Sequence, residues 1–131
     1  MRVMTEPYFD KTANTGGKHF INATRFSLQG LKSAVQRESA FRQELFFAVP
    51  VLLSGAYFAA SWFHFLLLLC AVLLVLIVEL LNSGIEAAVD RAGTEHNELA
   101  GLAKDYGSAA VMLALLLAGA VWLTILALAL F

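Results

Sequence analysis

Five polar residues between positions 79 and 90 form the part of the chain best suited to chemistry. They are Glu79, Asn82, Ser83, Glu86 and Asp90. Because an α-helix advances by about 100° per residue, this spacing places all five on one helix face about 100° wide. We call this face the acidic stripe. Its three carboxylates repel one another, so we predict that a cation stabilises them.

Two kinds of cation suit the acidic stripe. One is a basic side chain of the chain itself, with Lys104, Arg37 and Arg42 as candidates. The other is a divalent metal, and ligands that are all oxygens suit Mg²⁺, which also binds phosphates. Glu38 and Glu44 precede the long apolar run and provide further carboxylates at a similar depth. Both cations remain open at this point.

The apolar run before Glu79 places this carboxylate inside a membrane. Residues 45–78 contain no Asp, Glu, Lys or Arg, a stretch too long for one span of about 20 residues. A carboxylate beyond this run is costly unless it is protonated, paired or hydrated. The structural alternative is a protonated Glu79 that donates a hydrogen bond to a neighbouring helix. We favour a functional carboxylate, because it heads a stripe of further acids.

The elements that position the stripe are predicted to be helices of an all-α integral membrane protein. Hydrophobic residues make up 60% of the chain, too many for an ordinary soluble domain. We expect three spans, at about 42–61, 65–91 and 106–131, with a tight turn at residues 61–64 and a hydrophilic loop at 92–105. Trp62 in this turn suits the boundary between membrane and water.

An amphipathic surface helix is expected before the spans. Residues 1–17 indicate a mobile tail, and residues 18–131 form a single membrane-embedded domain. From about 18 to 37, apolar or small residues recur at helical spacing opposite a basic polar face, a pattern typical of helices that lie on a membrane surface. The recurring residues are Phe20, Thr24, Leu28, Leu31 and Val35.

The basic residues predict the orientation. Seven of the nine precede the first span, and Arg91 and Lys104 flank the loop at 92–105. The positive-inside rule then puts the N-terminus and this loop in the cytoplasm. The net charge of −1 indicates no preference for nucleic acid. Asp105 suits a cap at the start of the third span, and Glu95 and Asn97 suit solvated loop positions.

Three segments resemble the prokaryotic diacylglycerol kinase family. They are residues 38–44 (ESAFRQE), 78–91 (VELLNSGIEAAVDR) and 103–111 (AKDYGSAAV). The resemblance covers residues 18–131 and is closest to the Gram-negative branch. It implies a homotrimer with shared active sites in the cell inner membrane, which uses MgATP to phosphorylate the primary hydroxyl of 1,2-diacylglycerol to phosphatidic acid. The related undecaprenol kinases are the alternative.

The resemblance also implies roles for individual residues. Glu79 is the general base, Asn82 orients the catalytic site, and Glu38 and Glu86 bind the metal. The implied nucleotide-binding residues are Glu38, Glu86, Glu95, Asn97, Lys104, Asp105, His19 and Phe26. The implied lipid-substrate residues are Ala23, Ser27, Ala40, Gln43, Glu44 and Ser108. His19, Phe26 and Asn97 stand where the family usually has arginine, tyrosine and histidine.

Two other functions are compatible with a carboxylate on a membrane helix. A small proton-coupled exporter would use Glu79 alone, but it leaves the other acids and Lys104 without a role. A non-enzymatic assembly or regulatory subunit would pair the stripe with basic residues of a partner. Transfer of labelled phosphate from ATP to a lipid distinguishes a kinase from both.

Overall fold

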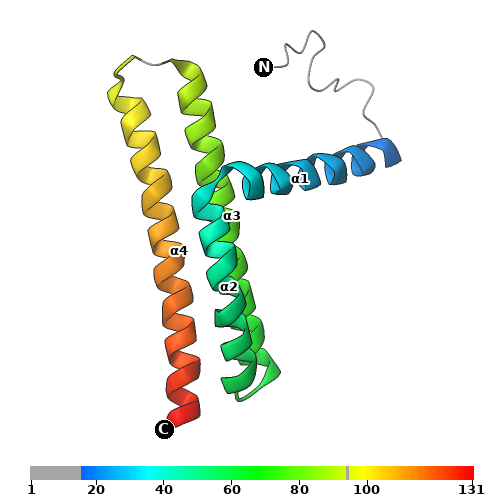
Figure 1. Cartoon of the computed structure of the whole chain (residues 1–131), viewed down its shortest axis with the longest axis vertical. Helices are drawn as coiled ribbons and strands as arrows, with labels where there is room; N and C mark the ends of the chain where they lie inside the picture. The colour runs from blue at the N-terminus through cyan, green and yellow to red at the C-terminus, as the bar shows by residue number, and fades with distance from the viewer. Residues whose placement is uncertain (1–15, 94) are drawn as a thin grey trace. The chain divides into compact units, whose positions relative to one another are not determined.

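The computed structural model describes residues 16–93 and 95–131, and the regular elements within them are helices (Figure 1). The four helices are α1 (Gly17–Arg37), α2 (Ser39–Phe58), α3 (Trp62–Ala92) and α4 (Glu98–Leu130). The prediction of an all-α chain is therefore confirmed. Residues 1–15 of the predicted tail lie outside the described part of the chain. The chain forms two compact units, Met1–Arg37 and Glu38–Phe131, which are described separately.

The first unit contains the amphipathic helix α1. Five of its large apolar side chains are exposed, and these five fall within one sector of the helix about 100° wide. They are Phe20, Ile21, Leu28, Leu31 and Val35. An exposed apolar sector opposite a basic polar face is the pattern expected of a helix that binds a membrane surface, and this role remains a prediction.

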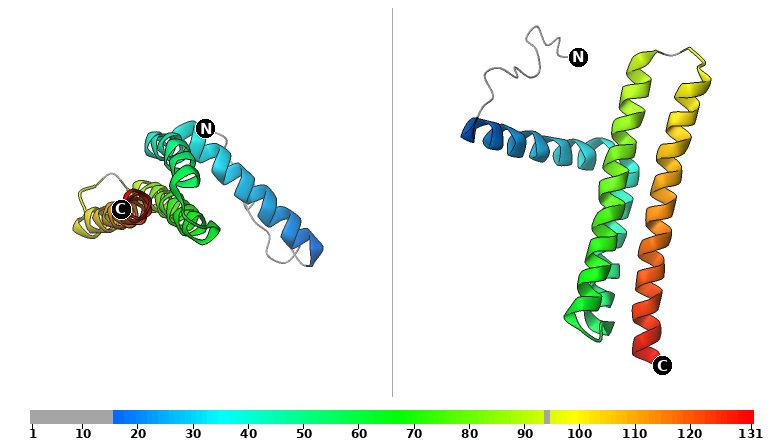
Figure 2. Two further views of the ribbon diagram at one scale, coloured as in Figure 1. Left: turned by 90° about the horizontal axis from the view of Figure 1, so that it is seen from below. Right: turned by 180° about the vertical axis from the view of Figure 1, so that it is seen from behind.

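The second unit is built on the antiparallel pair α3 and α4, which lie side by side in both views (Figure 2). Helix α2 packs mainly on α3 and also contacts α4. Its close approach to α3 depends on Gly55, since a Cβ atom there would strike the side chain of Leu68. Leu68 is fully buried, and it belongs to a core cluster with Ala48, Val72 and Ile125.

A side-chain hydrogen bond joins α2 to α4. The indole Nε1 of Trp122 donates to Ser54 Oγ at 2.9 Å, and Ser54 Oγ donates in turn to the carbonyl oxygen of Val51 at 2.9 Å. Both groups are partly buried in an apolar region, where polar side chains need a partner. The bond therefore links the C-terminal half of α2 to the C-terminal half of α4.

The turn between α2 and α3 comes earlier than predicted. Helix α2 ends at Phe58 and α3 begins at Trp62, so the prediction of a turn at residues 61–64 is wrong for all but Ser61. Ser61 is the N-cap of α3, and its Oγ accepts a hydrogen bond from the backbone N–H of His64 at 3.4 Å. This cap allows the helix to start at Trp62, which the polarity pattern alone did not indicate.

The loop between α3 and α4 is shorter than predicted. Helix α4 begins at Glu98, so Lys104 and Asp105 lie on a helix, and the expectation that Asp105 caps this helix is wrong. The cap is Asn97, whose Oδ1 accepts hydrogen bonds from the N–H groups of Leu99 at 2.9 Å and Ala100 at 3.2 Å. Two satisfied amide donors explain why the helix starts here.

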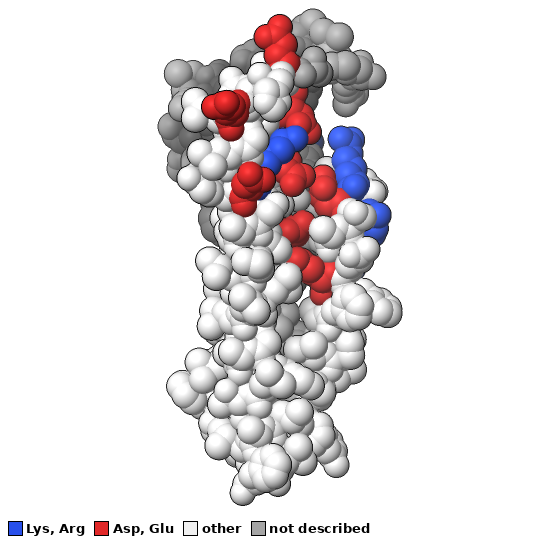
Figure 3. All heavy atoms as spheres, turned by 90° about the vertical axis from the view of Figure 1, so that its left-hand side faces the viewer, with Lys and Arg blue, Asp and Glu red and all other residues white. Residues whose placement is uncertain are grey.

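The lengths and compositions of α3 and α4 suit membrane crossing. Trp62–Ala92 and Glu98–Leu130 are the two described helices that are long and apolar enough to cross a bilayer. Figure 3 shows acidic side chains gathered toward one end of the face in view, while the other end carries no charge. Many large apolar side chains on these helices are exposed, as expected of surfaces that face lipid. A third span, on α2, remains a prediction.

Candidate functional site

The acidic stripe lies on α3 as predicted, and burial decreases along it. Glu79 is only 4% exposed and Asn82 only 8% exposed. One and two turns further on, Glu86 is half-buried, and the Asp90 side chain is 68% exposed. The stripe therefore passes from the packed interior of the helices to solvent within about 17 Å of helix.

Asn82 lies at a close contact between α3 and α4. Its Nδ2 donates a long hydrogen bond of 3.4 Å to Glu86 Oε1. Its Oδ1 is buried and has no hydrogen-bond partner among the described residues. A Cβ atom at Gly107 on α4 would collide with this oxygen. The missing side chain of Gly107 thus makes room for the Asn82 amide.

Glu79 stands at the centre of a group of carboxylates. It is repelled by Glu86 and Glu38, and Glu44 is repelled by Glu79. The half-buried Glu44 comes from α2, and its Oε2 atom is buried without a hydrogen-bond partner among the described residues. The packing therefore concentrates negative charge from α2, α3 and the residue before α2 around Glu79, and this arrangement favours the binding of a cation or a proton donor.

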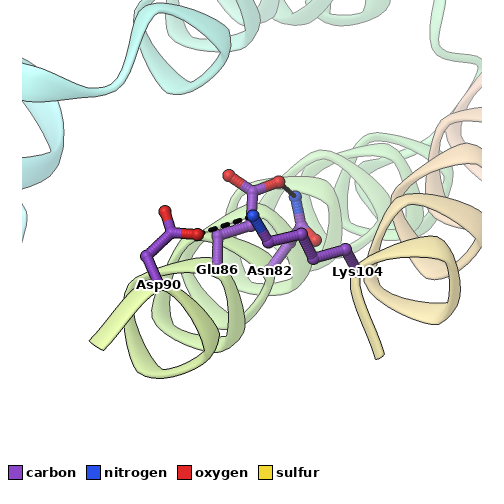
Figure 4. Close-up of polar contacts among 4 residues, drawn as sticks. All are labelled: Asn82, Glu86, Asp90 and Lys104. Carbon is purple, nitrogen blue, oxygen red and sulfur yellow. Dashed lines mark hydrogen bonds and ion pairs between the residues drawn. The ribbon is translucent and has the colours of Figure 1, made fainter. Parts of the chain in front are cut away.

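The chain itself supplies one cation to the stripe. Lys104 Nζ on α4 lies 2.6 Å from Asp90 Oδ1. Figure 4 shows the Lys104 side chain reaching from α4 to the stripe, with its ammonium group at Asp90 and with Asn82 and Glu86 beside it on α3. Lys104, one of the cations considered from the sequence, therefore lies at the exposed end of the stripe.

A polar cavity of about 680 Å³ opens where α3 and α4 meet their connecting loop. Four residues predicted to bind nucleotide line it together, namely Glu95, Asn97, Lys104 and Asp105. Asp90 closes it on the α3 side. A volume of this size is in the usual range for a small-molecule site.

An apolar groove of about 300 Å³ lies further along the same unit. It runs between α2, α3 and α4, with Glu44 as its charged residue and Trp122 among its apolar walls. The other wall residues include Ala48, Val51, Val72, Val75 and Leu115. The groove suits an amphiphile with an apolar chain and a polar group that can donate to Glu44.

Two carboxylates near Glu79 are candidates for holding magnesium. Mg²⁺ keeps several waters and binds through one or two carboxylates together with substrate phosphates. Glu86 and Glu38 are oxygen donors that act electrostatically on the same carboxylate, Glu79. Within residues 16–93 and 95–131, no group of three or more His, Cys, Asp or Glu side chains is arranged to hold a metal ion. Binding through two carboxylates plus phosphate remains compatible with this arrangement.

Comparison with known proteins places the chain in a family. The model of the prokaryotic diacylglycerol kinase family matches residues 25–126, most of the chain. The chain belongs to this family. Proteins named diacylglycerol kinase are similar to it over most of their length. That of Haemophilus influenzae is 49% identical, and the match covers 82% of this chain and 92% of the relative. That of Escherichia coli is 47% identical, and the match covers 86% of this chain and 92% of the relative.

More divergent members of the kinase family match as well. The diacylglycerol kinase of Pseudomonas aeruginosa is 44% identical, with 86% of this chain and 91% of the relative covered. The matched region includes α3, the loop and the site-bearing part of α4. The family resemblance inferred from the three segments is therefore confirmed.

The remaining residues assigned through the kinase family are spread over three helices. Ala40 and Gln43 are exposed on α2, and Ser108 is exposed on α4. In the first unit, α1 carries His19, Ala23, Phe26 and Ser27, and Ser27 Oγ donates to the Ala23 carbonyl oxygen at 2.9 Å. Their roles toward nucleotide and lipid stay predictions.

Three residues that sequence reasoning passed over contribute to the site. His96 lines the polar cavity. Gly107 accommodates Asn82, and Trp122 bounds the apolar groove. The position of Gly107 inside a family segment, directly after Lys104-Asp105-Tyr106, was the available signal for this glycine. The other contacts depend on how α3 and α4 are turned toward each other.

Proposed function

We propose that this protein is an ATP-dependent lipid kinase that phosphorylates the primary hydroxyl of 1,2-diacylglycerol to phosphatidic acid. The order of residues along α3 is the observation that carries the proposal. Val72, Val75 and Leu76 line the apolar groove, Glu79 to Glu86 carry the buried polar groups, and Val89 and Asp90 line the polar cavity. One helix thus connects a place for a lipid chain, a buried carboxylate and a place for a polyanion.

Glu79 has the position required of a general base toward a lipid hydroxyl. It lies between the groove and the cavity on α3, nearly excluded from water. In the proposed reaction the Glu79 carboxylate accepts the hydroxyl proton while the hydroxyl oxygen attacks the γ-phosphorus. The bond from the γ-phosphorus to the β–γ bridging oxygen breaks, and ADP leaves. Asn82, which donates a hydrogen bond to Glu86, would orient the site.

Other polar residues of the unit would serve the nucleotide. Glu86 and Glu38 would hold Mg²⁺, which neutralises phosphate charge when it is bound. Lys104 and Asp105 would contact the nucleotide from α4, and Glu95 and Asn97 from the loop side of the cavity. Glu44 would receive the lipid head group, since its unpartnered Oε2 lies at the groove.

The setting of this enzyme is proposed from the family and the charge pattern. We place it in the cell inner membrane as a homotrimer with shared active sites, with α2, α3 and α4 as spans and α1 on the cytoplasmic surface. Supporting observations are the two helices that are long and apolar enough to cross a membrane, and the charged side chains gathered toward one end of the face in Figure 3. Six of the nine basic residues precede α2, which favours a cytoplasmic active site.

A transfer assay tests the activity directly. The purified full-length protein in detergent micelles, with Mg²⁺ and γ-labelled ATP, is expected to label short-chain 1,2-diacylglycerol. Undecaprenol in a parallel reaction tests the alternative lipid, and the Glu79→Gln protein supplies the background. Label on undecaprenol alone would replace the proposed substrate by the alternative one. No label on either lipid would contradict a kinase and favour an exporter or a regulatory subunit.

Glu86→Gln is expected to raise the Mg²⁺ requirement. The substitution keeps the shape of the side chain and its contact with Asn82, but it removes one charged metal ligand. The Mg²⁺ concentration for half-maximal activity should rise about tenfold or more, as for other losses from metal sites. Titration of activity with Mg²⁺ at saturating ATP measures it. Arg91→Gln, which changes an exposed charged residue of α3 outside the cavity lining, is the control. An unchanged Mg²⁺ titration for Glu86→Gln would argue against this ligand.

A further inference from the structure

An ion pair that the proposed reaction does not use ties α3 to α4 at the polar cavity. Lys104 Nζ donates to Asp90 Oδ1 at 2.6 Å, and both residues line the cavity. Figure 4 shows that Lys104 crosses from α4 to reach the last acid of the stripe. Lys104 has a proposed role toward the nucleotide, whereas Asp90 has none.

Stability alone does not account for this pair. The Lys104 side chain is 40% exposed and the Asp90 side chain 68% exposed. Ion pairs between exposed groups contribute little to the free energy of folding, because water and salt screen them. A flexible lysine nevertheless loses much of its rotamer freedom when its ammonium group is held at 2.6 Å. The main consequence of the pair is the placement of one cation.

The placement matters because a second acid competes for the same lysine. Glu86, one helical turn before Asp90, also attracts Lys104 electrostatically. If Lys104 moved from Asp90 to Glu86, it would neutralise the proposed metal ligand and draw its ammonium group away from the cavity. Asp90 therefore keeps the lysine one turn away from Glu86 and leaves that carboxylate available.

We propose that Asp90 is a positioning residue, which holds Lys104 at the mouth of the cavity for the nucleotide phosphates and away from Glu86. This inference rests on the proposed kinase function. Since the ammonium group is ordered before the nucleotide arrives, less freedom is lost on binding. Asp90 itself contacts neither the metal nor the phosphates in this proposal, and it acts through Lys104 alone.

Asp90→Asn tests the proposal with little change of shape. We expect the KM for ATP to rise about fivefold, in line with the loss of one immobilised long side chain, while the KM for diacylglycerol stays unchanged. Equilibrium binding of a non-hydrolysable ATP analogue with Mg²⁺, measured by calorimetry, should weaken by a similar factor. Asp90→Glu, which keeps the charge, should restore most of the affinity. Arg91→Gln changes an exposed charged residue of α3 outside the cavity lining and should have little effect.

A double-mutant cycle separates positioning from a general structural role. In a Lys104→Met background, Asp90→Asn should produce no further loss of nucleotide binding, because the group on which it acts is gone. Equal losses in both backgrounds would overturn the proposal. Unchanged nucleotide affinity in the Asp90→Asn protein would also overturn the proposal. Tighter binding would overturn it too, because it would mean that Asp90 competes with the phosphates. Failure of the kinase proposal has a different signature, a wild-type protein that transfers no phosphate to either lipid.

Discussion

Replacing Glu79 by glutamine is expected to abolish phosphate transfer while the protein still folds and assembles. Glutamine matches glutamate in shape but cannot accept the hydroxyl proton. General-base catalysis typically contributes a factor of about 10²–10⁴, so kcat should fall by at least about a hundredfold. The assay is transfer of labelled phosphate to diacylglycerol at saturating MgATP.

The stability of the Glu79→Gln protein supplies an independent check. Glu79 is only 4% exposed and is repelled by neighbouring carboxylates, so a neutral side chain should leave the melting temperature unchanged or raise it. Thermal unfolding in detergent and size-exclusion chromatography measure this. A purified Glu79→Gln protein with the wild-type elution volume and nearly normal turnover would show that Glu79 is not the base.

Gly107→Ala is expected to impair the site by displacing Asn82. The new Cβ would clash with Asn82 Oδ1, and Asn82 Cγ would lie only 3.2 Å away. The amide must therefore turn or α4 must move outward, and either change breaks the contact between Asn82 and Glu86. Overpacking of this kind costs about 1–3 kcal/mol. We expect kcat to fall about tenfold or more, together with a lower melting temperature.

Gly84→Ala is the matched control for this prediction. Gly84 lies on α3 two residues from Asn82, and nothing is within 4 Å of a Cβ placed there. Alanine should stabilise the helix slightly at this position, since it has the higher helix propensity. If Gly107→Ala retained full activity and stability like Gly84→Ala, the close contact between α3 and α4 at Asn82 would not be needed for catalysis.

The acidic stripe shows how far local spacing can predict this site. Helical periodicity depends only on the rise and rotation of one helix, so it placed Glu79, Asn82 and Glu86 on one face correctly. The apolar run before Glu79 likewise indicated a membrane helix, and α3 is one of the two helices that qualify. The three family segments identified the family, which the comparisons confirmed.

Helix boundaries were less predictable, because capping competes with polarity at a helix start. The loop was predicted at residues 92–105, but the two hydrogen bonds accepted by Asn97 allow α4 to begin at Glu98. Lys104 consequently lies on a rigid helix facing α3. In the same way, the Ser61 cap allows α3 to begin at Trp62, earlier than the predicted start at about residue 65.

The sequence by itself determined the class of protein, the family and the face of α3 that carries the carboxylates, since these follow from composition and from spacing within single helices. Only the tertiary structure decided that Lys104 pairs with Asp90, that Gly107 makes room for Asn82, and that Glu44 lies at an apolar groove. Each of these contacts joins two helices. Their formation depends on how the helices are rotated and how closely they approach, which packing of all the side chains sets together.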